Sequence, residues 1–249
     1  MEGARQLYAG FRLESEIYNE DGVGITSEDM FYTKEEFAKF VADAKELGVK
    51  VVPEIDTPGH SLALVKVFPQ LGIRNPETAD LLDVSKKETR ELVKNIWREY
   101  LISETSEQST FAQCEVLHIG MDEYFGKPEE YISYLIELSE YIKELAPEKE
   151  IRMWGSLTGM ECDYSKVSKD ISIQLWSTDW ADPTDMYNAG FDIINSQNTK
   201  LYLVPGTGYD RLDVEYLTNS WEPNVFEGSK KKWVIPSYSS QMQGACYML

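Results

Sequence analysis

The chain has only two histidines, and each lies in a short run where an apolar segment turns into carboxylates and glycine. The first run, 53–60, reads Pro-Glu-Ile-Asp-Thr-Pro-Gly-His and follows the largely apolar residues 49–52. The second, 118–123, reads His-Ile-Gly-Met-Asp-Glu and follows residues 116–117. An apolar strand that ends in acids and histidine is typical of an active site at the C-terminal mouth of a parallel barrel. Both runs therefore predict an α/β fold with its site at strand ends.

The adjacent acids Asp122 and Glu123 are the chemical core of this prediction. Side chains of neighbouring residues at a strand end point in different directions, so the two carboxyl groups can share one substrate without sharing one environment. One can stay protonated and act as an acid while the other stays ionised. In a chain with 43 acidic residues the pair could instead be an exposed loop start. Gly120 before the pair and the aromatic residues 124–125 after it favour a catalytic role.

Helical and strand patterns alternate along the chain, which predicts a parallel sheet or barrel. The first thirty residues, with several glycines and many acids, are expected to be loop. About six of the eight strands of a barrel can be recognised. Helices are predicted at 34–47 (after the capping residue Thr33), 86–101 and 128–145, and strands or apolar runs at 49–55, 115–120, 150–154, 171–176, 191–194, 200–203, 233–236 and 245–249.

The run 118–123 resembles the signature of family 20 glycoside hydrolases, the β-N-acetylhexosaminidases, whose pattern is His-x-Gly-x-Asp-Glu. The run 53–60 is similar to the preceding strand-end motif of that family, Pro-Glu-Ile-Asp-x-Pro-Gly-His. Weaker matches follow in family order at residues 152–155, 174–176 and 201–203, so the resemblance extends from Phe31 over nearly the whole chain. It implies a single catalytic domain over residues 1–249, an incomplete (β/α)8 TIM-type barrel truncated at both ends.

The resemblance also implies a reaction, the retaining exo-hydrolysis of terminal β-linked N-acetylglucosamine or N-acetylgalactosamine. In that family the 2-acetamido oxygen of the substrate attacks the anomeric carbon, and the enzyme supplies no nucleophile. Glu123 would protonate the leaving-group oxygen and later activate water. Asp122 would orient and polarise the acetamido group, and Tyr202 would donate a hydrogen bond to its oxygen. His60 would lie near the acid and tune its proton affinity.

Further residues are expected to bind the substrate or to support the pocket. Tryptophans would wall the pocket and give the sugar an apolar face, although any one of them could equally be packed in the core. Where many family members carry an aspartate two residues after the tyrosine, this chain has Val204, and Asp210 or Glu222 could take its place. The family's sugar-holding arginine and the aspartate that pairs with His60 would precede the chain. The expected substrate-binding residues are Trp154, Trp176, Trp221, Asp56, His118 and Glu222.

Composition limits the partners. The net charge of −19 repels phosphate backbones and anionic membranes, so a nucleic-acid partner is not expected. The resemblance implies a glycan with a terminal N-acetylhexosamine as the partner. No stretch is long and apolar enough to insert into a membrane, and residues 1–4 open no signal peptide, although family analogy suggests a secreted or cell-surface bacterial enzyme. Neither metal-ligand spacing nor a disulfide framework is recognisable, and no cofactor is expected. The oligomeric state stays open.

Two other functions remain compatible with the sequence. One is a related disaccharide-releasing hexosaminidase of the lacto-N-biosidase type, which only the depth of the pocket would distinguish. The other is a non-catalytic sugar-binding barrel, against which the intact Asp122 and Glu123 argue. Because six strands leave a barrel open, residues 1–249 alone are expected to be poorly soluble and inactive.

Overall fold

The computed structural model describes residues 10–73, 79–103, 108–206, 208–228 and 231–248, in two compact units, Met1–Glu150 (unit 1) and Ile151–Leu249 (unit 2). The described residues from 10 to 33 form turns and isolated bridges without a helix or strand, as predicted. That both units form one catalytic domain stays a prediction.

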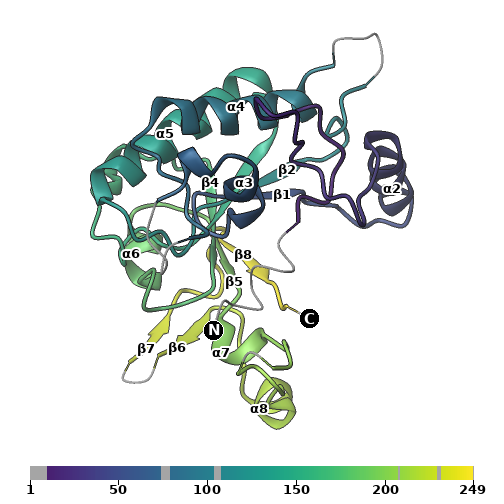
Figure 1. The fold of residues 1–249 in the computed structure, drawn as a ribbon. Coiled ribbons are helices and arrows are strands. Elements are labelled where there is room, and N and C mark those ends of the chain that lie inside the picture. The colour runs from purple at the N-terminus through teal and green to yellow at the C-terminus, as the bar shows by residue number, and fades with distance from the viewer. Residues whose placement is uncertain (1–9, 74–78, 104–107, 207, 229–230, 249) are drawn as a thin grey trace. The chain divides into compact units, whose positions relative to one another are not determined.

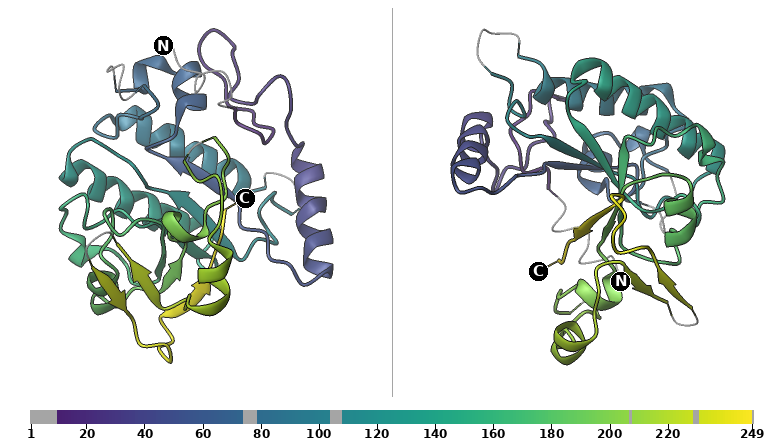
Figure 2. Two further views of the ribbon diagram at one scale, coloured as in Figure 1. Left: turned by 90° about the horizontal axis from the view of Figure 1, so that it is seen from below. Right: turned by 180° about the vertical axis from the view of Figure 1, so that it is seen from behind.

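Unit 1 combines two parallel strands with a layer of helices (Figure 1). Strand β1 (Glu54–Thr57) pairs in parallel with β2 (Val116–Gly120). Helices α4 (Lys87–Leu101) and α5 (Pro128–Leu145) lie side by side in every view (Figures 1 and 2). Each buries one apolar stripe at helical spacing, as the sequence predicted. The segment between β1 and α4 holds α3 (Leu62–Val67) and the 3-10 helix η1 (Pro69–Leu71).

Helix α2 (Lys34–Glu46) begins where its capping residue predicts. The Thr33 hydroxyl accepts a hydrogen bond from the Glu36 amide, and the Glu36 carboxylate accepts one from the Thr33 amide. The described residues cover the apolar side chains of α2 unevenly. Val41 is buried, whereas Phe40 is 50 % exposed and Leu47, which follows the helix, is 83 % exposed.

The predicted start of the first strand is wrong. Residues 49–53 are not part of β1, which begins at Glu54. The amide of Val49 instead donates to the carbonyl of Ala44 and closes the end of α2, so this part of the apolar run serves the helix terminus.

Unit 2 contains four parallel strands in the order β3, β4, β5, β8. Three shorter helices and one 3-10 helix connect them. Two additional strands form a separate antiparallel pair, β6 with β7. The bounds are β3 (Glu150–Trp154), η3 (Tyr164–Lys166), β4 (Ile171–Leu175), α6 (Pro183–Asn188), β5 (Ile193–Asn195), α7 (Asn198–Leu201), α8 (Val214–Asn219), β6 (Val225–Glu227), β7 (Lys232–Val234) and β8 (Met242–Ala245).

Three predictions fail in unit 2. The apolar run predicted at 245–249 overlaps the last strand, β8, only at Ala245, and the described residues 246–248 lie outside that strand. Of the strand predicted at 200–203, residues 200–201 end the short helix α7, and Tyr202 forms an isolated bridge with Met248. The strand predicted at 233–236 is β7, which pairs with the unforeseen β6 rather than with a parallel neighbour. The parallel strands still number six within the described residues, two in unit 1 and four in unit 2. The predicted fold class, an α/β protein with about six strands of a barrel, is therefore confirmed.

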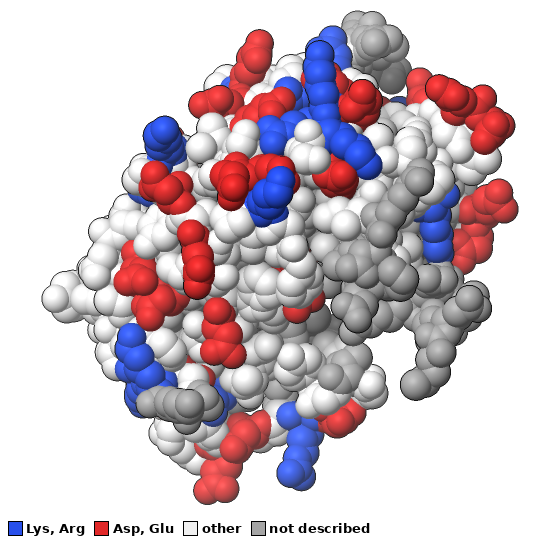
Figure 3. All heavy atoms as spheres, turned by 60° about the vertical axis from the view of Figure 1, so that its left-hand side comes forward, with Lys and Arg blue, Asp and Glu red and all other residues white. Residues whose placement is uncertain are grey.

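The surface carries mixed charge. On the face shown in Figure 3, acidic side chains are spread widely and basic side chains lie among them. This face therefore presents no continuous basic surface, in keeping with the net charge of −19. Among the described residues, no helix has both the length and the apolar character needed to cross a membrane.

Candidate active site

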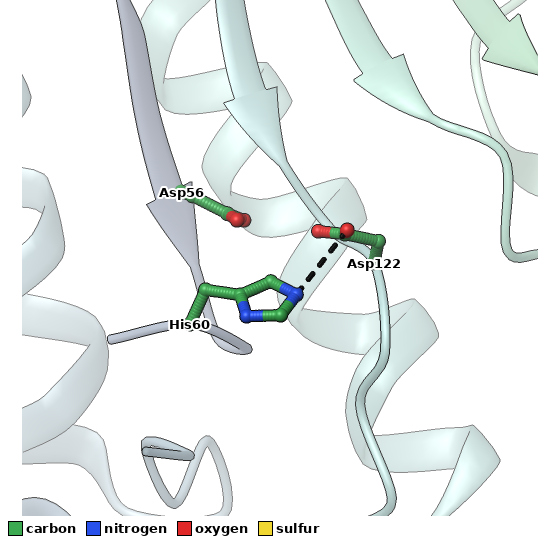
Figure 4. Close-up of side chains that lie close together, drawn as sticks. All are labelled: Asp56, His60 and Asp122. Carbon is green, nitrogen blue, oxygen red and sulfur yellow. Dashed lines mark ion pairs between the residues drawn. The ribbon is translucent and has the colours of Figure 1, made fainter. Parts of the chain in front are cut away.

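The C-terminal ends of β1 and β2 bring Asp56, His60 and Asp122 together (Figure 4). In the ladder Glu54 lies opposite His118 and Thr57 opposite Gly120, so three steps along β1 match only two along β2. Such an irregularity inserts an extra residue and re-aims a side chain. Asp56 lies within this segment, and its carboxyl group points toward Asp122 (Figure 4).

Gly120 makes this approach possible. Its φ is +73°, and a Cβ at this position would lie 1.9 Å from Asp56 Oδ1 and 2.6 Å from the Asp56 Cα. A side chain is therefore excluded both by backbone conformation and by space. The glycine of the motif lets the two strand ends come within contact distance of each other.

We expect Gly120→Ala to lower the free energy of unfolding by about 3 kcal/mol, since left-handed strain of about 1 kcal/mol adds to a steric overlap of about 2 kcal/mol. Gly48→Ala is the matched control, because Gly48 has a φ of +76° and nothing within 4 Å of its added Cβ. Gly48→Ala should lower the free energy of unfolding only by the left-handed strain, about 1 kcal/mol. Urea unfolding of both variants measures the difference, and equal losses would show that the contact with Asp56 is not tight.

The turn after β2 is strained and firmly held. Met121 and Glu123 have φ values of +85° and +46°, which cost non-glycine residues about 1–2 kcal/mol each. The Met121 amide donates to the Thr57 carbonyl at 3.0 Å, and the Tyr131 hydroxyl donates to the Met121 carbonyl at 2.8 Å. Helix α5 also supports the end of β1, where the hydroxyl groups of Tyr134 and Thr57 are 2.7 Å apart. These contacts fix the direction in which Asp122 and Glu123 leave the strand.

The loop after β1 packs directly against the turn after β2 that carries Asp122 and Glu123. Its Thr57–Pro58 peptide is cis, and His60 has a φ of +49°. A Cβ on Gly59 would lie 2.4 Å from the carbonyl oxygen of Asp122, so this position also requires glycine. The Ser61 hydroxyl donates to the Gly59 carbonyl at 2.9 Å and holds the loop in this shape.

The His60 imidazole lies between the two acids of the predicted catalytic pair. Its Nε2 is 3.4 Å from Asp122 Oδ2 and 3.2 Å from Glu123 Oε2, while its Nδ1 is 3.9 Å from Asp80 Oδ2. The hydrogen bond to Asp122, aided by the charges of all three carboxylates and opposed by desolvation, raises the pKa of His60 to about 9. At neutral pH His60 is therefore an imidazolium ion held between Asp122 and Glu123.

Asp56 lies in a different electrostatic environment. The residue is partly accessible, but its Oδ1 atom is buried. Burial, together with the nearby negative charges of Asp122 and Glu54, raises the pKa of Asp56 well above its usual value, with a smaller opposing effect from the Met121 backbone.

His118 lies beneath the site rather than in its opening. It is only 3 % exposed, and its Nδ1 accepts a hydrogen bond from the Gly120 amide at 3.2 Å. The same nitrogen is 3.5 Å from a carboxylate oxygen of Glu54. This position favours support of the strand end over direct contact with substrate.

The cluster of Asp56, His60 and Asp122 is also a candidate metal site. One donor atom each from Asp56, His60 and Asp122 lies within 4.8 Å of the others, a donor set that suits a divalent cation. A histidine must lose its proton to bind a metal, and the pKa of about 9 means that a proton already competes for His60 at neutral pH. The cluster therefore fits a protonated histidine at least as well as a metal ion.

Structural context also reveals residues that the sequence did not indicate. Asp80 lies beside His60, whereas the resemblance had placed the partner of this histidine before the start of the chain. Tyr131 and Tyr134 support the two strand ends from α5. No local signal in the sequence showed what these two hydroxyl groups bind.

Unit 2 carries the remaining predicted residues at or near the ends of its strands. Trp154 ends β3, opposite Gln174 of the parallel strand β4, and Trp176 directly follows β4. Trp176 stacks on Trp180 with ring centroids 6.3 Å apart. Tyr202 follows α7 and meets Tyr209 edge to face at 5.4 Å.

Trp221 and Glu222 lie in the loop between α8 and β6. The indole nitrogens of Trp176 and Trp221 are both buried without a hydrogen-bond partner among the described residues, while Glu222 is exposed. That these residues of unit 2 share one pocket with Asp122 and Glu123 stays a prediction.

Comparison with known proteins agrees with this geometry. Residues 9–133 match the family model described as glycosyl hydrolase family 20, catalytic domain. The chain is 22 % identical over 81 % of its length to a lacto-N-biosidase from Bifidobacterium bifidum, and 28 % identical over 70 % of its length to a β-hexosaminidase from Vibrio furnissii. It spans only 19 % and 31 % of the lengths of these two proteins.

Solved structures share the fold. A family 20 β-N-acetylhexosaminidase from Streptomyces coelicolor superposes with a TM-score of 0.67 at 18 % identity, over 96 % of this chain and 50 % of that one. A β-N-acetylhexosaminidase from Bacteroides fragilis gives a TM-score of 0.61 at 22 % identity, over 81 % of this chain and 44 % of that one. Since the matched family model covers half of the sequence, including both strand ends that carry the clustered acids, the chain belongs to glycosyl hydrolase family 20.

Proposed function

We propose that the protein removes terminal β-linked N-acetylhexosamine from glycans by retaining exo-hydrolysis, with the 2-acetamido group of the substrate as the nucleophile. The observation that carries the proposal is the position of Asp122 and Glu123, consecutive residues at the end of β2 that both contact Nε2 of the same histidine. Family membership supplies the reaction class.

The closeness of the two acids argues against an enzyme-supplied nucleophile. A retaining glycosidase that forms a covalent intermediate places its acid and its nucleophile on opposite sides of the scissile bond. Asp122 and Glu123 are adjacent in the chain and are bridged by one imidazole, so they are poorly arranged to flank a sugar. A nucleophile that belongs to the substrate removes the need for such flanking.

Each acid has an environment suited to a different role. The Glu123 side chain is 39 % exposed, so it can reach a leaving-group oxygen as a general acid and a water molecule as a general base. The Asp122 side chain is only 13 % exposed and is held by His60, which suits an anion that orients the acetamido group and stabilises the charge of the cyclised intermediate.

Relatives support the class of sugar. Several curated relatives are β-hexosaminidases, and one solved neighbour, from Vibrio harveyi, is described as an exo-β-N-acetylglucosaminidase in complex with N-acetylglucosamine. Terminal N-acetylglucosamine or N-acetylgalactosamine is therefore the substrate proposed here. A second candidate, release of a disaccharide, is favoured by the lacto-N-biosidase match over 81 % of the chain.

A panel of nitrophenyl glycosides tests the proposal. We expect turnover of N-acetylglucosaminide or N-acetylgalactosaminide to exceed that of the glucoside by at least about 10³-fold, because the glucoside lacks the intramolecular nucleophile. A thiazoline mimic of the cyclised intermediate should inhibit competitively. Preference for a lacto-N-bioside would select the second candidate. A sugar covalently attached to Asp122 or Glu123, detected by mass spectrometry, would contradict the mechanism, and binding without any turnover would indicate a sugar-binding barrel.

A further inference from the structure

The carboxyl groups of Asp56 and Asp122 face each other at the ends of β1 and β2 (Figure 4). The Oδ1 atoms of Asp56 and Asp122 are both buried, and neither has a hydrogen-bond partner if both groups are carboxylates. Ionised carboxylates can only accept hydrogen bonds, so two of them cannot satisfy each other. Asp56 can take this position only because residue 120 is glycine, since a side chain there would overlap Asp56.

The surroundings offer little positive charge to compensate. His60 is the described cation in contact with the pair, and it is engaged with the other oxygen of Asp122, Oδ2, and with Glu123. Tyr134 lies near Asp56, but its hydroxyl is paired with that of Thr57. The titratable and charged groups around Asp56 are Glu54 on β1, His60 and Asp80 on the following segment, His118 on β2, Asp122 and Glu123 on the turn, and Tyr134 on α5 with Arg90 and Glu137 beyond it.

We propose that Asp56 is a neutral carboxylic acid that donates a hydrogen bond to Asp122 and thereby keeps the Asp122 carboxyl group correctly oriented for the acetamido group. The proposal rests on the function proposed above and adds a positioning residue to it. The raised pKa of Asp56, caused by burial and by the charges of Asp122 and Glu54, agrees with a proton on this residue.

This arrangement gives Asp122 a donor on each side. Oδ2 faces the imidazolium of His60, and Oδ1 accepts the proton of Asp56. Two opposed donors fix the plane of the Asp122 carboxyl group. The proton on Asp56 also removes the repulsion that two neighbouring anions would create.

Two variants separate the hydrogen-bond donor from the loss of the carboxyl group. Asp56→Asn keeps a donor to Asp122, whereas Asp56→Leu has similar size and no donor. We expect Asp56→Asn to retain kcat on an N-acetylglucosaminide within about fivefold and Asp56→Leu to reduce it by about 100-fold or more, with smaller changes in KM. Equal losses in both variants, with the wild type active, would overturn the proposal.

The pH dependence of stability tests it without catalysis, and so remains informative if the proposed reaction is wrong. Asp56 has a raised pKa, so above pH 3.8 the folded protein keeps a proton that the unfolded chain releases, and stability falls as pH rises toward the folded pKa. Asp56→Asn should weaken this fall in urea unfolding between about pH 4 and pH 8. Asp43→Asn, which removes an exposed acid of α2, should leave it unchanged.

Two results would overturn the proposal here. One is an Asp56→Asn curve parallel to that of the wild type, which would mean that Asp56 is ionised in the folded protein. The other is a wild-type protein that is destabilised by a chelator and restored by Zn²⁺ alone, which would mean that a cation rather than a proton joins the two carboxylates.

Discussion

Replacing Glu123 with glutamine is expected to reduce kcat/KM by about 10³-fold on substrates with poor leaving groups, such as a disaccharide, and by less than about tenfold on a dinitrophenyl glycoside. Glutamine keeps the size of the side chain but cannot transfer a proton. A sugar oxygen needs that proton to leave, whereas a dinitrophenolate does not. The Brønsted plot of rate against leaving-group pKa should therefore become much steeper in the variant.

The Glu123→Gln experiment needs a control for backbone strain, because Glu123 has a φ of +46°. Glu161 is a second glutamate with positive φ, +52°, and is exposed in unit 2. Glu161→Gln should leave the leaving-group dependence at its wild-type value. If Glu123→Gln lowered both classes of substrate by the same factor, Glu123 would act in folding or binding rather than as the acid.

Replacing Asp122 with asparagine is expected to lower kcat on N-acetylglucosaminides by about 10²–10³-fold with a smaller change in KM. The anion would stabilise charge that develops on the acetamido group only as it attacks, so the loss falls on the transition state. Affinity for a thiazoline inhibitor should fall together with kcat, since the inhibitor mimics the cyclised species.

Asp80→Asn is the control that distinguishes the loss of kcat in Asp122→Asn from the effect of removing any negative charge near His60. Asp80 is the other carboxylate on that histidine, 3.9 Å from Nδ1, and is absent from the proposed chemistry. We expect its replacement to change kcat by less than about threefold. The opposite order, with Asp80→Asn the more harmful change, would mean that Asp122 acts chiefly by charging His60. NMR titration of the two histidines would then show which carboxylate controls the imidazole.

The predictions that succeeded from sequence depend on short-range interactions. The capping box of Thr33 and Glu36 set the start of α2, and Pro128 set the start of α5, because helix ends are decided within about one turn. Apolar runs located most of the strands of the α/β fold. The strand-end motifs marked the residues that lie together at the ends of β1 and β2, while their catalytic role stays a prediction.

The elements that the sequence did not predict depend on pairing between segments that are distant in the chain. An apolar run becomes a strand only where a neighbour pairs along it. Residues 49–53 therefore stay outside β1, and the run predicted at 200–203 makes only an isolated bridge after α7. The antiparallel pairing of β6 with β7 likewise depends on a turn and a partner that hydrophobicity does not specify.

The same division holds for the site. The sequence by itself determined which residue types end β1 and β2, and placed Asp122 beside Glu123. Only the tertiary structure decided that His60 lies between these two acids, that Asp80 borders it, and that Asp56 faces Asp122 across Gly120. Burial and charge at a carboxyl group depend on everything packed within a few ångströms of it, so the proton that Asp56 is proposed to hold could not be inferred from a linear motif.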